Sequence, residues 1–104
     1  MTKIHIHDLN LLLNSVIRKP DSVIGDTYWK ISKIKNGVFL ITLHRPNIHA
    51  TINTDLISFA EFMDSGYILE HFYDTTTNEY IDTTKSVFIS YDSFIIQRYY
   101  TDEI

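Results

Sequence analysis

The sequence predicts an α+β fold: an antiparallel sheet of about four to six strands with two helices packed on one face, in the order α-ββ-α-ββ(β). Two stretches, residues 9–17 and 56–63, carry apolar residues at helical spacing. Two β-prone runs flank Asn36-Gly37, which is the strongest short hairpin signal. The 104 residues, of which 44% are hydrophobic, are enough for a modest core, and we expect a single domain spanning residues 1–104.

The first predicted helix covers residues 9–17, after a short strand or extended lead-in at residues 4–7. Asp8 is a good N-cap, and Pro20 ends the helix because the residue before a proline avoids the α region. The apolar residues recur at i, i+3, i+4, i+7 and i+8, as on one helical face: Leu9, Leu12, Leu13, Val16 and Ile17.

Residues 27–45 predict a β-hairpin with two open choices of loop length. A two-residue loop would pair Lys35 with Val38, whereas a three-residue loop ending at Gly37 would pair Ile34 with Val38. We favour the longer loop because it gathers apolar side chains on one face, with Lys33 as the one charged residue among them. The apolar residues are Trp29, Ile31, Phe39, Ile41 and Leu43. The other face is mixed and open to a partner: Lys30, Ser32, Ile34, Val38, Leu40 and Thr42.

The second predicted helix begins after Asn53 or Thr54 and ends before Gly66, which sits where a C-cap glycine belongs. Its buried stripe would consist of Leu56, Phe59, Ala60 and Met63. The remaining chain predicts strands at residues 67–73, 80–83, 87–91 and 94–100. For residues 94–100 a short helix is the alternative, and their Ile and Tyr content favours the strand.

Charge divides the chain into two halves of opposite sign. Residues 1–53 carry seven basic and three acidic groups, whereas residues 54–104 carry two basic and ten acidic groups. Six of the seven tyrosines also lie in the acidic half. Such asymmetry bears on binding partners rather than on the fold.

Tyrosines among carboxylates are typical of a protein-binding surface, in which aromatic anchors stand inside a polar rim. We therefore predict a small, acidic, non-enzymatic interaction module. Small acidic domains of this sort resemble phage or mobile-element inhibitors of the anti-CRISPR and anti-defence type. Such an inhibitor would occlude a basic, nucleic-acid-binding surface of its target protein. The predicted binding residues are Glu79, Tyr80, Asp82, Tyr91, Asp92, Tyr99, Tyr100 and Asp102.

Two alternatives use other residues. In a metal-binding protein or small metalloenzyme, His5 and His7, at i and i+2 on a strand, could bind a metal together with His71 or His44 as third ligand. Apart from this alternative we expect no cofactor. A nucleic-acid-associated accessory protein would instead use the basic hairpin. Its basic residues are Lys30, Lys33, Lys35 and Arg45. The lysines stand at i, i+3 and i+5 and would not share one face of a regular strand, which argues against a ribbon that reads a groove but leaves a non-specific patch open. We do not expect direct nucleic-acid binding.

Several classes of function lack their sequence signal. The chain has no cysteine and three glycines, which excludes a thiolate zinc site and a glycine-rich phosphate loop. No serine lies in a Gly-x-Ser-x-Gly turn. No apolar run is long enough for a membrane span and no signal peptide is evident, so we expect a cytoplasmic protein. The last strand, if it is a sheet edge, could pair with its twin in a homodimer.

Overall fold

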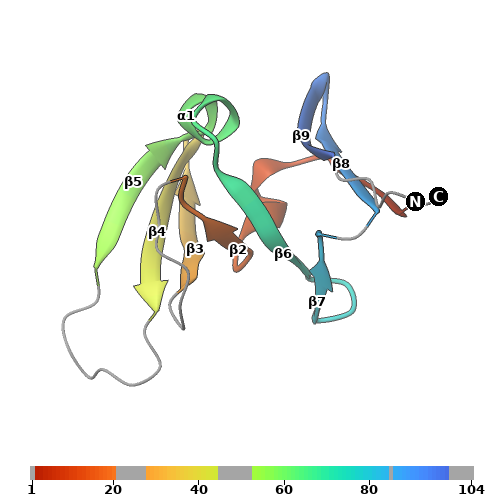
Figure 1. Cartoon of the computed structure of the whole chain (residues 1–104), viewed down its shortest axis with the longest axis horizontal. Helices are drawn as coiled ribbons and strands as arrows, with labels where there is room; N and C mark the ends of the chain where they lie inside the picture. The colour runs from red at the N-terminus through yellow and green to blue at the C-terminus, as the bar shows by residue number, and fades with distance from the viewer. Residues whose placement is uncertain (1, 21–27, 45–52, 85, 99–104) are drawn as a thin grey trace.

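The structure is a computed structural model that describes residues 2–20, 28–44, 53–84 and 86–98. These residues form two sheets, a short α-helix and a single 3₁₀-helix (Figure 1). The smaller sheet has the order β1 (Thr2–Ile6), β8 (Val87–Tyr91), β9 (Phe94–Arg98). The larger has the order β5 (Thr54–Ser58), β4 (Val38–His44), β3 (Tyr28–Lys35), β2 (Val16–Arg18), β6 (Ile68–Asp74), β7 (Glu79–Asp82).

The predicted fold class is wrong, because the described residues are mostly β, with 60% strand and 12% helix, and contain no pair of helices packed on a sheet. The first predicted helix is instead the 3₁₀-helix η1 (Leu9–Leu12) followed by strand β2. Asn14, with φ +68°, turns the chain between them. β2 then pairs with both β3 and β6, so long-range pairing overrides a helical pattern whose Leu12 and Ile17 are buried all the same.

The second predicted helix is split between strand β5 and helix α1 (Phe59–Asp64). Ser58, not Asn53 or Thr54, is the N-cap, since its side chain accepts a hydrogen bond from the Glu61 N–H. Gly66 has φ +79°, which confirms it as the glycine after the helix end.

The central hairpin has the two-residue loop, so the favoured register is wrong at the turn. Lys35 pairs with Val38, and Asn36 and Gly37 both have positive φ, of 51° and 73°, as a type I′ turn requires. A β-bulge between Ile31 and Lys33 then shifts the register of β3 by one residue. The predicted core face therefore survives with one exchange: Ile34 faces inward in place of Lys33.

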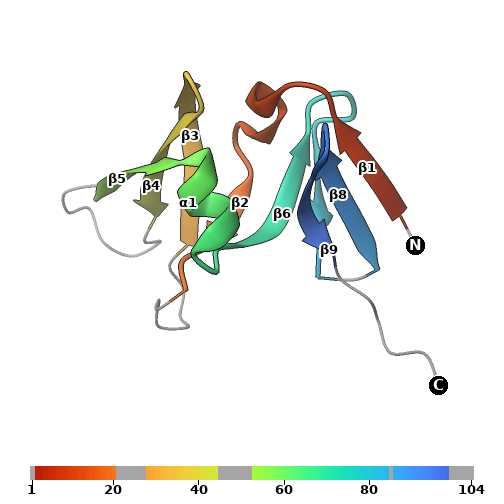
Figure 2. The ribbon, with the colours of Figure 1, turned by 90° about the horizontal axis from the view of Figure 1, so that it is seen from above.

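One cluster of buried side chains joins the two sheets, α1 and η1. It consists of Ile6, Leu12, Ile17, Ile31, Phe39, Ile41, Ile57, Phe62, Leu69, Phe72, Val87 and Ile89. The smaller sheet lies on the β6 side of the molecule, away from β5 (Figures 1 and 2). The core thus occupies the inner face of the larger sheet, and the opposite face is left without a described layer over it.

A polar clamp connects the sheets at Leu69 of β6. The side-chain amide of Gln97, on β9, donates to the Leu69 carbonyl at 2.7 Å and accepts from the Leu69 N–H at 3.0 Å. The buried Thr83 hydroxyl donates to the same carbonyl. Because β7 pairs with β6 only from His71 onward, the amide replaces a missing strand partner.

The predicted strand at residues 94–100 is confirmed as far as Arg98.

The described residues contain no helix that combines the length and the apolar character needed to cross a bilayer.

Candidate functional site

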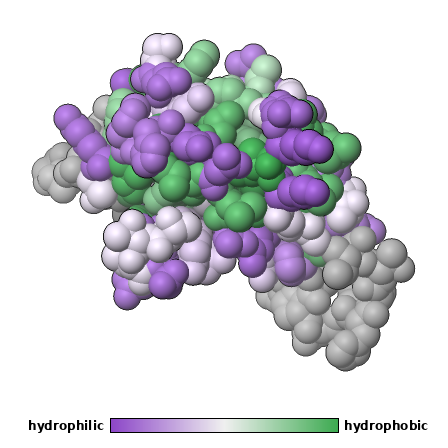
Figure 3. Space-filling view, turned by 180° about the vertical axis from the view of Figure 1, so that it is seen from behind, coloured by the Kyte–Doolittle hydropathy of each residue, from purple (hydrophilic) through white to green (hydrophobic). Residues whose placement is uncertain are grey.

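The outward face of the larger sheet is the candidate functional surface. On strands β3 and β4 this face carries the cross-strand pairs that project to the side opposite the buried Ile31–Ile41 pair. It continues over Val16 of β2, which pairs with His71 of β6, and ends at β7. We call this surface the open face. Seen from behind the view of Figure 1, apolar side chains reach the surface of the molecule between hydrophilic ones (Figure 3).

The β6–β7 end of the open face, which we call the tyrosine–acid part, is organised around Tyr80. Its ring packs on Tyr73 at 4.9 Å and on His71 at 6.5 Å between centroids. Its hydroxyl donates to the carbonyl of Asn14 at 3.1 Å, while 49% of the residue remains exposed. The ring is therefore both accessible and held in place.

Partial burial raises the pKa of the Tyr80 hydroxyl, and the neighbouring phenols of Tyr28 and Tyr73 raise it further. A phenol with a raised pKa stays protonated at physiological pH, so Tyr80 remains a hydrogen-bond donor. Tyr28 itself stacks on His44 across the β3–β4 pair, with centroids 5.1 Å apart.

Strands β6 and β7 carry three carboxylates close to Tyr80 in the pairing of the two strands: Asp74, Glu79 and Asp82. Asp74 pairs with Glu79 at the end of the β6–β7 ladder. Asp82 accepts from the Thr84 N–H at 2.9 Å and Asp74 accepts from the Thr76 N–H at 2.9 Å, so both carboxylates are oriented by their own turns. β7 ends the strand order of the larger sheet, which leaves one side of it without a partner among the described strands.

The predicted binding residues are therefore not all in one place. Glu79, Tyr80 and Asp82 share β7, but Tyr91 belongs to the smaller sheet. There its ring packs edge-on against Phe59 of α1, 5.8 Å between centroids. Asp92, with φ +50°, forms the β8–β9 turn. The remaining predicted residues lie outside the described residues: Tyr99, Tyr100 and Asp102.

The histidines proposed as metal ligands lie on different sheets. His5 is on β1, where its Nδ1 is 3.1 Å from the Ser90 hydroxyl, whereas His71 is on β6. His7 follows the end of β1, and His44 ends β4. In the part of the chain that the structure describes, no three His, Cys, Asp or Glu side chains are grouped so as to hold a metal ion.

The β3–β5 end of the open face, which we call the lysine–leucine part, was predicted only as an alternative site, through its lysines and the mixed face of the hairpin. Its bulge brings Lys30, Lys33 and Lys35 to the same side of β3, since they stand opposite Thr42, Leu40 and Val38. Next to them lies Leu56, which pairs with Leu40. Sequence reasoning assumed a regular strand and so divided the lysines between two faces. A bulge leaves little trace in a single sequence.

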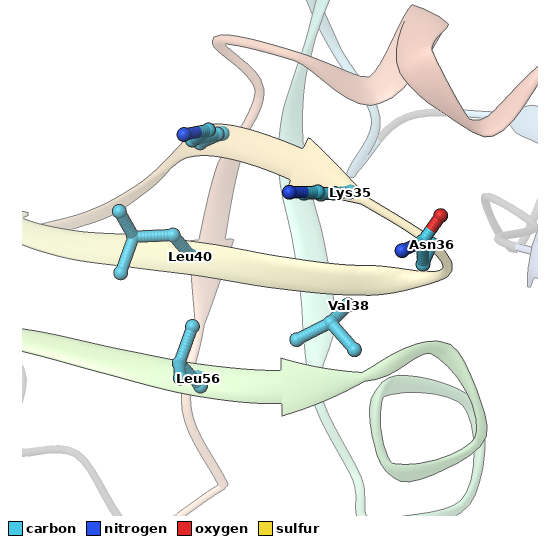
Figure 4. A pocket seen from close by; sticks show the side chains of 6 residues that line it. Lys35, Asn36, Val38, Leu40 and Leu56 are labelled. Carbon is cyan, nitrogen blue, oxygen red and sulfur yellow. The ribbon is translucent and has the colours of Figure 1, made fainter.

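An open hollow of about 400 Å³ lies on the outside of the sheet (Figure 4), and it is lined by Lys33, Lys35, Asn36, Val38, Leu40 and Leu56. Leu56 is 65% exposed and Val38 38% exposed. Among the described residues the salt bridges join Arg18 to Glu70 and Lys19 to Asp55, and none involves the three lysines of β3. The hollow thus combines an apolar floor with a cationic rim.

Comparison of the chain with protein-family models, with curated proteins and with solved structures finds no match.

Proposed function

We propose that this protein is a non-enzymatic protein-interaction module that binds a partner with a basic surface through its tyrosine–acid part. The observation that carries the proposal is the state of Tyr80, an exposed aromatic ring fixed by Tyr73, His71 and the Asn14 carbonyl. Aromatic anchors of this kind contribute most of the affinity at protein interfaces. A ring that is already held loses little conformational entropy on binding.

The carboxylates on β7 determine the kind of partner. Glu79 and Asp82 flank Tyr80 on β7, and their charges complement Lys and Arg side chains of a partner. The free side of β7 also offers main-chain groups to which an extended segment of the partner could pair as an added strand. Both features favour a basic partner segment that contains a side chain to stack on or against the tyrosine ring.

In the inhibitor form of this proposal, the partner's basic surface is one that otherwise holds nucleic acid, and the carboxylates occupy the places of phosphates. Association between such opposite charges would be fast and would weaken with added salt.

An affinity capture from a bacterial lysate, read by quantitative mass spectrometry, tests the proposal with three baits. The first is the unchanged protein; the second carries Glu79→Gln, Tyr80→Ser and Asp82→Asn; the third, a control, carries Glu61→Gln and Asp64→Asn on α1. We expect one protein to be captured by the first and third baits, to be lost from the second, and to elute at raised salt.

Recovery of the same proteins in the same amounts by all three baits would contradict the proposal. Unfolding of each bait, followed by the fluorescence of Trp29, shows whether a loss of capture reflects the surface or the fold.

A further inference from the structure

The three lysines of β3 owe their common face to the β-bulge. Without it, strand alternation would put Lys33 on the core side together with Ile31. The Ser32 hydroxyl, at the bulge, lies 2.7 Å from the Thr42 hydroxyl on the outward side. Lys33 then stands opposite Leu40, and Ile34 opposite the buried Phe39. Bulges commonly redirect a side chain towards a binding surface.

The apolar floor next to the lysines is costly to expose. Leu40 of β4 and Leu56 of β5 form a cross-strand pair, and Val38 lies two residues along β4. All three project to the side of the sheet where Lys35 lies (Figure 4). Covering aliphatic surface of this kind removes it from water and stabilises a complex in proportion to the area covered.

We propose that the lysine–leucine part binds an acidic, amphipathic, extended segment of a partner protein. Carboxylates of the segment lie against Lys33 and Lys35, and an aliphatic side chain between them enters the hollow formed by Val38, Leu40 and Leu56. Alternation of side chains along an extended segment provides this pattern, with every second residue facing the sheet and the rest at its rim. This proposal does not depend on the function assigned to Tyr80, because the two surfaces share no residue.

Other occupants fit the surface less well. Single-stranded nucleic acid binds by stacking its bases on exposed aromatic rings. On the open face of the β3–β4 pair the aromatic rings are those of Tyr28 and His44, which stack on each other. A second copy of the chain placed across a two-fold axis would bring the lysine rims of both copies together, which the charges oppose.

Fluorescence anisotropy with a labelled ten-residue peptide, in which glutamate alternates with leucine and threonine, tests the proposal on the full chain. A second peptide has glutamine at every glutamate position. We expect the acidic peptide to bind at least about tenfold more tightly than the glutamine peptide at low salt, and to lose that advantage at high salt.

Two variants locate the binding, and one controls for charge. Lys33→Gln with Lys35→Gln, and separately Leu56→Ser, should each weaken binding of the acidic peptide by about tenfold. Lys3→Gln, which changes an exposed residue of β1 in the smaller sheet, should leave it within about twofold. Variants that alter Tyr80, Glu79 and Asp82 should also leave it unchanged, so this test and that of the proposed function can fail separately.

Three results would overturn the inference. The first is equal binding of both peptides, or full binding by the double lysine variant. The second is tighter binding of a single-stranded oligothymidylate than of the peptide, lost in the same variant, which would assign the face to nucleic acid. The third is a dimer in light scattering that Leu56→Ser dissociates, which would assign it to a second copy of this chain.

Discussion

The two ends of the open face belong to one sheet surface but differ in how their side chains are supported. In the tyrosine–acid part, the Tyr80 hydroxyl and two carboxylates are held by hydrogen bonds within the protein. In the lysine–leucine part, Lys33 and Lys35 form no ion pair with a described residue, and Leu56 is largely exposed. The first is a preorganised polar surface. The second exposes apolar side chains next to lysines that have no ion-pair partner among the described residues.

This difference shows why net charge is a poor guide to partners. The chain carries −4 overall, yet one sheet face presents carboxylates at one end and lysines at the other. Surface charges act mainly over about a Debye length, roughly 8 Å at physiological salt. Each end can therefore select a partner of its own, and the following experiments test whether the two ends are independent.

The largest expected difference in stability is between a variant on the inner side of β4 and a variant on the outer side of its neighbour β5. Phe39 is fully buried and packs against Phe59 and Phe62, with centroids 6.3 and 5.6 Å away, so Phe39→Ala should lower the free energy of unfolding by about 3–5 kcal/mol. Leu56→Ser, on the outer side of the neighbouring strand, should change it by about 0.5 kcal/mol or less. Urea unfolding of both variants measures the contrast. A similar loss in both would mean that the lysine–leucine part serves stability instead of binding.

A smaller loss of stability is expected when the hydrogen bonds that connect β6, in the tyrosine–acid part, to the smaller sheet are removed. Gln97→Met keeps the size of the side chain but leaves the Leu69 N–H without its partner, and should cost about 1–3 kcal/mol. Ile95→Thr, on the same strand but 45% exposed, is the control and should cost little. Hydrogen exchange at the Leu69 amide provides a local readout. Unchanged protection there in the Gln97 variant would disprove the role of the clamp.

Removing the hydroxyl of Tyr80 should have a modest effect. Tyr80→Phe loses the hydrogen bond to the Asn14 carbonyl and should cost about 0.5–1.5 kcal/mol. Because the raised pKa of this phenol favours its protonated form, stability from the group is complete below pH 10 and declines as pH rises above it. Unfolding at pH 7 and pH 11, with the variant compared to the unchanged protein, measures this. A variant that loses as much stability on alkalinisation as the unchanged protein would exclude Tyr80 as the source.

The smallest expected effect concerns the salt bridge beneath the lysine–leucine part. The Lys19 ammonium, 2.8 Å from the Asp55 carboxylate, lowers the pKa of Asp55. A lowered folded-state pKa means that the stabilisation is present above the ordinary pKa of 3.8 and is lost as pH falls through the lower value. Because the pair is exposed, Asp55→Asn should cost only about 0.5 kcal/mol at pH 7 and nothing at pH 2. A cost that persists at pH 2 would point to a role beyond charge.

Sequence reasoning succeeded where the signal was local. The position of the hairpin at Asn36-Gly37, though not its favoured loop length, was expected, as were the glycine after α1 and the last strand, and Ile31, Phe39 and Ile41 were correctly assigned to the core. Turn chemistry and apolar patterning act over a few residues, so they can be read without knowledge of the rest of the chain.

The helices were overestimated because apolar spacing over residues 9–17 and 56–63 satisfies more than one structure. Leu12 and Ile17 are buried by a 3₁₀-helix and a strand as well as by one helix. Which alternative forms depends on neighbours far along the chain, since β2 is held between β3 and β6. Local propensity is weak enough for such pairing to override it.

By itself, then, the sequence determined the turn residues, most of the core-facing side chains and the division of charge along the chain. The tertiary structure alone decided the two-sheet arrangement, with β1 running parallel to β8, and the bulge that turns Lys33 outward. These depend on strand pairing across tens of residues, and a shift of one residue in that pairing exchanges the two faces of a strand. The lysine–leucine part exists because of one such shift.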